Sequence, residues 1–137
     1  MKTTSEKINI LIIFIVSISA NFYYGSIGVF PIDTFAFFDS ANLINQGFFP
    51  IRDYWTSNGF LVDYMQSIFF KFFGVTWKIY LLHSSLINFV FVLTTYKFLI
   101  NEGLTKETAL FYSISSGILA YPSAGVPFPD HHSLIFS

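Results

Sequence analysis

Carboxylates gather in one stretch of this chain, residues 30–74, which holds four of its five aspartates. These four are Asp33, Asp39, Asp53 and Asp63. Strongly apolar segments flank the stretch on both sides, so its carboxylates are expected at a boundary between lipid and water. A carboxylate at such a boundary can act as a general base, because partial burial tunes its proton affinity. Arg52 and Lys71 of the same stretch are cations that can neutralise a phosphate.

A second group with chemical potential is the run Asp130-His131-His132, which follows a segment rich in Pro and Gly. Carboxylate and imidazole groups are common metal ligands, so the run predicts a site for a divalent metal ion or for a phosphate. Adjacent residues rarely all face one ion, and one or two of the three are expected to take part. A polar turn without a ligand is the alternative interpretation.

Composition places these residues in an apolar chain. Of 137 residues, 53% are hydrophobic and only 11% are charged, whereas a soluble domain carries about 25% charged residues. The net charge of −1 gives no electrostatic reason to expect nucleic acid as a partner. The absence of cysteine excludes disulfides, thiolate metal sites and cysteine nucleophiles.

The apolar pattern predicts an all-α polytopic membrane protein with three transmembrane helices and the start of a fourth. A span needs about 20 predominantly apolar residues. The expected spans are residues 8–28, 79–100 and 108–124, with a fourth beginning near residue 133. A cleaved signal peptide and a buried soluble helix are alternatives for the first of them. We expect residues 1–137 to be the N-terminal part of one membrane domain, a fragment of a larger protein.

The long loop between the first two spans, residues 29–78, is expected to hold two short interfacial helices. The first covers residues 35–46 and ends at Gly47, and the second covers Leu61–Phe73 and ends at Gly74. In the second helix Asp63, Ser67 and Lys71 share one face and apolar residues cover the rest, which is typical of a helix in the membrane surface. Asp39 and Asp63 are therefore predicted on solvated faces.

The boundaries of the last predicted span carry local signals. Asn101-Glu102-Gly103 predicts a helix end, and Thr105 is a suitable N-cap for the helix that follows. A second outer loop is expected at residues 125–132. Basic residues are densest in the N-terminal tail and in the turn between the second and third spans, which predicts a cytoplasmic N-terminus and outer loops on the other side. These basic residues are Lys2, Lys7, Lys97 and Lys106.

The loop resembles the first outer loop of the GT-C membrane glycosyltransferases, closest to the bacterial branch related to protein O-mannosyltransferases and aminoarabinose transferases. In that family an acidic residue follows the first span, before a helix that ends in Gly. A G-x-x-P-x-x-D-x-W segment and a second helix with a K-x-F-G-like stop come next. Here Gly47–Trp55 reads GFFPIRDYW and Lys71–Gly74 reads KFFG.

The resemblance implies a glycosyltransferase in the bacterial inner membrane. It would transfer a sugar from a polyprenyl-phosphate donor to a glycan, lipid or protein acceptor at the outer face. Asp33 falls on the family's catalytic base, although Thr34 stands where many members have a second acidic residue, so Asp39 stays open as the base. Asp130 matches a second acidic residue of the family, and we expect the fragment alone to be inactive.

The remaining site residues follow from the same resemblance and from the residue types. Substrate contacts are expected from Arg52, Asp53, Trp55, Lys71 and His131. A divalent metal ion, if the reaction uses one, is expected at Asp130, His131 and His132.

Other interpretations compete with this one. A transporter or flippase for lipid-linked saccharides would show charged residues or Gly/Pro breaks in mid-span. A non-catalytic membrane fragment would need none of these aspartates. Asp33 could simply cap a helix that starts near Thr34, and Asp53 could anchor the loop. Trp55 could sit in an aromatic interface belt, and His83 is expected to be an interfacial or packing histidine.

Overall fold

The computed structural model describes residues 4–27, 31–56, 60–120 and 127 of the chain, and at Thr4, residues 31–33 and Ala120 it describes the backbone alone. Within these ranges the chain forms five α-helices and no strand, which confirms the predicted all-α class. The helices are α1 (Thr4–Ile27), α2 (Pro31–Asn45), α3 (Leu61–Phe73), α4 (Trp77–Asn101) and α5 (Lys106–Ala120).

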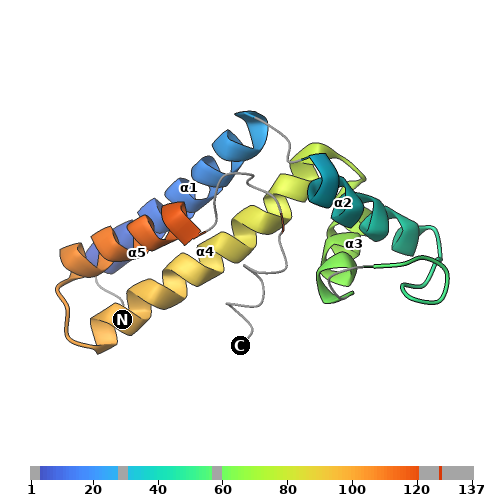
Figure 1. Cartoon of the computed structure of the whole chain (residues 1–137). Coiled ribbons are helices and arrows are strands. Elements are labelled where there is room, and N and C mark those ends of the chain that lie inside the picture. The colour runs from blue at the N-terminus through green and yellow to red at the C-terminus, as the bar shows by residue number, and fades with distance from the viewer. Residues whose placement is uncertain (1–3, 28–30, 57–59, 121–126, 128–137) are drawn as a thin grey trace.

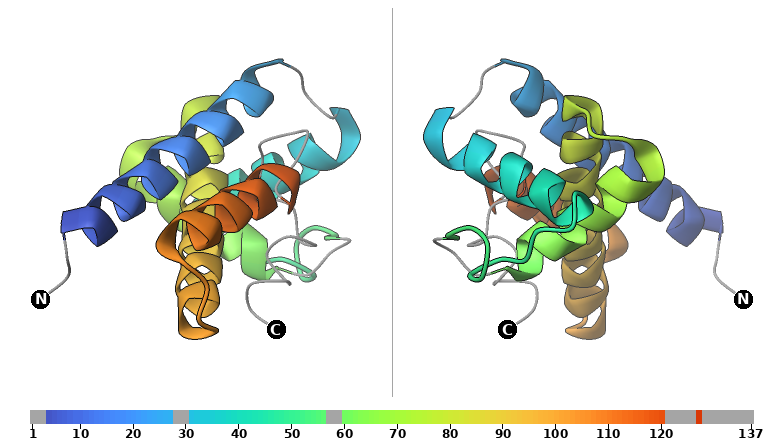
Figure 2. Two further views of the ribbon diagram at one scale, coloured as in Figure 1. Left: turned by 90° about the vertical axis from the view of Figure 1, so that its left-hand side faces the viewer. Right: turned by 90° about the vertical axis from the view of Figure 1, so that its right-hand side faces the viewer.

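The long helix α4 is the central element (Figure 1). Helices α1 and α5 both pack along it and also contact each other, so the three form a small bundle. Helices α2 and α3 pack against each other, and α3 also contacts α4. Figure 2 shows α2 and α3 from two further directions, at the end of the molecule where α4 begins. The segment between the first two predicted spans therefore forms a two-helix unit that packs on the start of α4.

Two of the described helices are long and apolar enough to cross a membrane. They comprise residues Ser5–Ile27 and Trp77–Asn101, with 23 and 25 residues, and they correspond to the first two predicted spans. Helix α5 has 15 residues, which make about 22 Å of helix, shorter than a hydrocarbon core of about 30 Å. The end of the predicted third span, residues 121–124, and the start of the predicted fourth lie outside the described residues.

Local signals explain where the helices begin and end. Gly47 and Gly103 both adopt a positive φ, of 92° and 90°. The amides of Phe48 and Leu104 reach back to the carbonyl oxygens of Leu43 and Leu99 over 3.1 Å, as in a Schellman motif. These contacts confirm the helix ends predicted at both glycines.

The helix starts agree less uniformly with the predictions. Thr105 Oγ1 accepts the Thr108 amide at 3.3 Å, which confirms the predicted N-cap of α5. Helix α2 starts at Pro31 instead of residue 35, because the fixed φ of proline suits the first helical position. Asp33 is therefore the third residue of α2 and not its N-cap, and the interpretation of Asp33 as the cap of a helix starting near Thr34 is wrong.

Small and polar side chains line the contacts inside the bundle. In α1 the buried positions recur every four residues, and they are Ile13, Ser17, Asn21 and Gly25. In α5 they are Ala109, Ser113 and Gly117. Large apolar residues of α1, such as Leu11, Ile15 and Tyr23, are exposed instead. A water-soluble helix shows the reverse arrangement, whereas small and polar contact residues are typical of helices that pack in lipid.

Helix α3 has the predicted bounds but the opposite orientation. Asp63 is fully buried, Ser67 is also buried, and the prediction that Asp63 lies on a solvated face is wrong. The exposed side chains of α3 are Leu61, Tyr64, Ile68, Lys71, Phe72 and Phe73. The reason is tertiary: α2 and α4 cover the polar face of α3. Asp39 on α2 is exposed, as predicted.

Candidate functional site

The loop after α2 is organised around the carboxylate of Asp53. Its Oδ2 accepts the Phe49 amide at 2.8 Å, and the Asp53 amide donates to the Phe49 carbonyl oxygen at 2.9 Å. Arg52 donates from Nε to Oδ1 at 2.8 Å and from Nη2 to Oδ2 at 2.6 Å. The Arg52 hydrogen bond, followed by that of the Phe49 amide, lowers the pKa of Asp53 to about 2. Asp53 is therefore a loop anchor that stays ionised at neutral pH.

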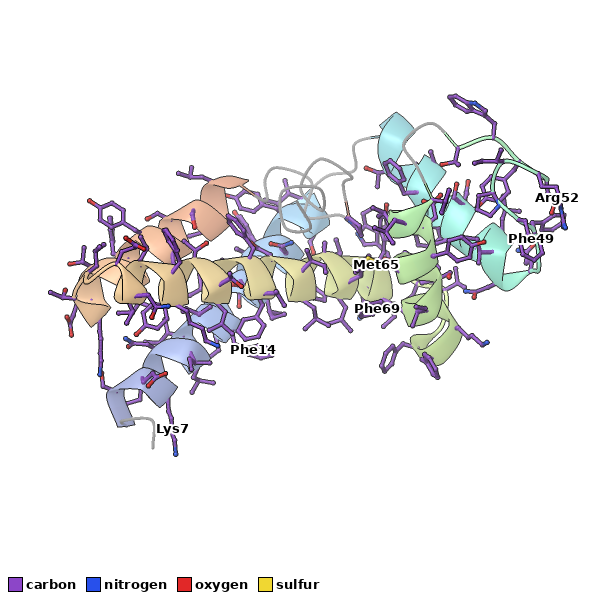
Figure 3. All side chains as sticks on the ribbon, turned by 90° about the horizontal axis from the view of Figure 1, so that it is seen from below. Lys7, Phe14, Phe49, Arg52, Met65 and Phe69 are labelled. Atoms are coloured by element: carbon purple, nitrogen blue, oxygen red, sulfur yellow. The ribbon has the colours of Figure 1, made fainter. Side chains whose placement is uncertain are left out.

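The guanidinium of Arg52 is held in place by this pairing. Its central carbon lies 4.4 Å from the centre of the Phe49 ring, a cation–π arrangement. Figure 3 shows Arg52 and Phe49 together at the tip of the loop beyond α2. The positive charge of Arg52 is thus already neutralised by Asp53, which makes it a weaker candidate for a phosphate contact than the sequence suggested.

The same loop contains a strained residue, Ile51, whose φ is +72°. A positive φ in a β-branched residue is unusual and is held only where the surroundings enforce it. Here the Ile51 amide donates to the Tyr54 carbonyl oxygen at 2.8 Å and closes the turn. Trp55, next in the chain after Tyr54, is 83% exposed, so its indole is accessible to lipid, water or a substrate.

The other predicted site residues lie apart or outside the described part. Asp33 lies in the first turn of α2, and its side chain is not described. Lys71 is exposed on α3 and makes no hydrogen bond or ion pair with the residues that the structure describes. Asp130, His131 and His132 lie outside the described residues. The predicted second outer loop is described only at Pro127.

A buried polar cluster that the sequence did not predict joins α3 to α4. It is the pair Gln66 and His83, and Asp63 lies one turn before Gln66 on α3; all three are fully inaccessible to solvent. His83 Nδ1 lies 2.8 Å from Gln66 Oε1, and the imidazole stacks on the Phe69 ring with centroids 4.8 Å apart. Figure 3 places Phe69 where α3 approaches α4. His83 is a buried packing histidine in this arrangement.

Asp63 is the buried carboxylate of α3. Its Oδ2 accepts the Thr56 hydroxyl at 3.3 Å, while Oδ1 has no partner among the described residues. Burial raises the pKa of Asp63 to about 6, and the Thr56 hydrogen bond offsets this only in part. A carboxylic acid with such a pKa can donate or accept a proton near neutral pH.

Hydrogen bonds from aromatic side chains attach α2 to α4 and to the loop that follows α2. Tyr80 of α4 donates from its hydroxyl to the Thr34 carbonyl oxygen at 3.0 Å, and Tyr54 donates to the Ser40 carbonyl oxygen at 3.2 Å. Thr34 follows Asp33 in the chain. The backbone beside the predicted catalytic base is therefore attached to the first turn of α4.

The sequence contains a signal for this buried face. Asp63, Gln66 and Ser67 follow the i, i+3, i+4 spacing of one helix face. The spacing of Asp63, Ser67 and Lys71 also predicts a polar face, but of these three only Lys71 is exposed. Within the described part of the chain, no three His, Cys, Asp or Glu side chains come together to hold a metal ion.

Comparison of the chain with protein-family models, with curated proteins and with solved structures finds no match.

Proposed function

We propose that the chain is the N-terminal part of a GT-C type membrane glycosyltransferase. The enzyme transfers a sugar from a polyprenyl-phosphate donor to an acceptor at the outer face of a bacterial inner membrane. The observation that carries the proposal is the position of Asp33, in the first turn of a short helix between two helices long enough to span a membrane. The order of the motif residues from Gly47 to Gly74 supports it.

In the proposed membrane arrangement, α1 and α4 are the first two spans and the N-terminus is cytoplasmic. Helix α5, continued through residues 121–124, is the third span, and a fourth begins near residue 133. Helices α2 and α3 form a cap at the outer surface. Support comes from the apolar outer faces of α1 and α3, and from the density of lysines at the opposite end of the bundle.

The proposed chemistry begins with the carboxylate of Asp33, or of Asp39, which accepts the proton of the acceptor hydroxyl. The acceptor oxygen attacks the anomeric carbon of the sugar, and the bond to the polyprenyl phosphate breaks. Lys71 contacts the leaving phosphate more readily than Arg52, because Arg52 is paired with Asp53. Trp55 offers an exposed ring on which a sugar can stack.

Asp130, His131 and His132 carry the donor groups that a divalent ion prefers. A metal bound there would stabilise the charge of the leaving phosphate. Asp130 and His131 are also the proposed second acidic residue and a substrate contact.

A lipid-linked saccharide transporter is less well supported than the transferase. Such proteins place their sites at broken helices near the membrane midplane. Helix α4 runs without a break from Trp77 to Asn101, and between Tyr80 and Tyr96 it has no Gly, Pro, Asp, Glu, Lys or Arg.

The test is transfer from a polyprenyl-phosphate sugar in membranes that contain the whole protein. Loss of a general base lowers a rate by roughly 100- to 10,000-fold, so we expect Asp33→Asn to abolish measurable transfer. Asp39→Asn distinguishes the two candidate bases, because it removes the same charge from an exposed site on the same helix. Loss in Asp39→Asn alone would move the base to Asp39, and normal transfer in both variants would refute the proposal.

A further inference from the structure

A pocket lies where α4 ends and α5 begins. Figure 1 shows that this end of the bundle is opposite α2 and α3. Its volume is about 250 Å³. The lining residues are Glu6 of α1, Tyr96, Lys97, Ile100 and Asn101 of α4, and Lys106 of α5. Sites for drug-sized molecules measure roughly 300–1,000 Å³, so this pocket suits one small polar group rather than a whole substrate.

Donor groups dominate the polar lining of the pocket. Lys97 and Lys106 bring two ammonium groups, and Asn101 brings a carboxamide. The buried Tyr96 accepts a hydrogen bond from Asn9 Nδ2 at 3.0 Å through its hydroxyl oxygen, so its own hydrogen can be donated. Helix α5 begins at Lys106, and the partial positive charge of a helix N-terminus adds to that of the lysines.

One carboxylate, that of Glu6, lines the same pocket. Its negative charge weakens the attraction of the pocket for an anion. Removing that charge is therefore a test of anion binding. Lys7, the neighbour of Glu6, extends away from the bundle in Figure 3 and takes no part in the lining.

We propose that this pocket binds the phosphate of an anionic phospholipid headgroup at the cytoplasmic surface of the membrane. The inference rests on the membrane placement of α1 and α4 proposed above, but not on the transferase activity. The ligand is a lipid because the pocket lies at the ends of both candidate spans, where the polar headgroups of a bilayer would meet it. Basic pockets between transmembrane helices on this side are typical headgroup sites.

The experiment is native mass spectrometry of the full chain in detergent, with phosphatidylglycerol or phosphatidylcholine added. We expect retention of phosphatidylglycerol in preference to phosphatidylcholine. Each of the variants Lys97→Gln and Lys106→Gln should weaken phosphatidylglycerol binding roughly fivefold. Lys78→Gln is the matched control, because it removes an exposed lysine at the opposite end of α4 and should leave binding unchanged.

A gain-of-binding variant guards against misfolding as an explanation. Glu6→Gln removes the opposing carboxylate and should strengthen phosphatidylglycerol binding. Equal retention of the two lipids, equal losses in Lys78→Gln and Lys97→Gln, or no gain in Glu6→Gln would each overturn the proposal. Inorganic phosphate that binds as tightly as the lipid would overturn the assignment to a headgroup. Failure of the glycosyltransferase proposal would leave all these results unaffected.

Discussion

Asn88 of α4 donates a hydrogen bond from Nδ2 to Oδ1 of Asn21 in α1 over 2.8 Å, and both side chains are buried. The bond joins the two helices that are candidates to span a membrane. Asn21 and Gly25 are one turn apart on the same face of α1. At Gly25 a Cβ atom would lie 2.2 Å from Leu81 Cδ2 of α4. The contact between α1 and α4 therefore combines a buried hydrogen bond with a close approach of the α1 backbone at Gly25 to Leu81 of α4.

The Asn21–Asn88 link should contribute measurably to the stability of the bundle. Hydrogen bonds between membrane helices contribute about 0.6 kcal/mol on average and up to about 1.7 kcal/mol. We expect a double-mutant cycle of Asn21→Ala and Asn88→Ala to give a coupling energy in this range, measured by reversible unfolding in mixed micelles. Strictly additive effects of the two substitutions would show that the link contributes nothing.

Close packing of α5 on α4 should make Gly117 intolerant of a methyl group. A Cβ at Gly117 would lie 2.2 Å from Val92 Cγ2. Val92 is β-branched and cannot rotate freely, so we expect Gly117→Ala to destabilise the bundle by about 1–3 kcal/mol. Gly25→Ala should have a smaller effect, because Leu81 meets the added methyl with the end of a more flexible side chain.

Substitution of Val92, the residue that the added methyl group of Gly117→Ala would meet, provides the control. Val92→Ala removes the clashing methyl group, so the double variant Gly117→Ala/Val92→Ala should be less destabilised than the sum of the two single variants. Thermal unfolding of the four proteins in one detergent measures this. Additive losses would mean that Val92 is not what excludes the methyl group.

Asp63 should make stability depend on pH. Its pKa of about 6 in the folded state is above the ordinary value of 3.8, so the folded state holds this proton more tightly than the unfolded state. The free energy of unfolding therefore falls as the pH rises from about 4 to about 6, and it stays reduced above that range. A shift of about two pH units corresponds to roughly 3 kcal/mol.

Substitution of Asp63 by Asn removes the titrating group. We expect this variant to lose the decline in stability between pH 4 and 6, measured by denaturation at a series of pH values. Asp39→Asn removes a charge from an exposed position and should keep the slope of the unaltered protein. An unchanged slope in Asp63→Asn would show that the buried carboxylate does not titrate in this range.

Replacement of Ile51 by glycine should stabilise the protein. A left-handed backbone costs a residue with a Cβ roughly 1–2 kcal/mol and costs glycine almost nothing. The Ile51 side chain is 73% exposed and loses little burial on removal. Glycine also makes the unfolded chain more flexible, so we expect Ile51→Gly to raise the unfolding free energy by no more than about 1 kcal/mol. Ile51→Ala, which keeps the strain, is the control and should bring no gain.

The sequence by itself determined the helical class of the described residues and the places where several helices end. The bounds of α3 were predicted to the residue, and the glycines at 47, 74 and 103 were identified as helix ends. These features depend on backbone conformation and on hydrophobic periodicity, which are local properties of the chain. The Asp53 loop anchor was also foreseen as an alternative, because its partner Arg52 is adjacent in the chain.

Only the tertiary structure decided which face of each helix is buried. Gln66 and His83 meet because α3 turns part of its polar face toward α4, a choice that the periodicity of α3 cannot make. A helix with one polar and one apolar face can bury either, depending on whether lipid or water covers the other. Here α2 and α4 are the helices that pack against α3, and the bond between Gln66 and His83 joins α3 to α4.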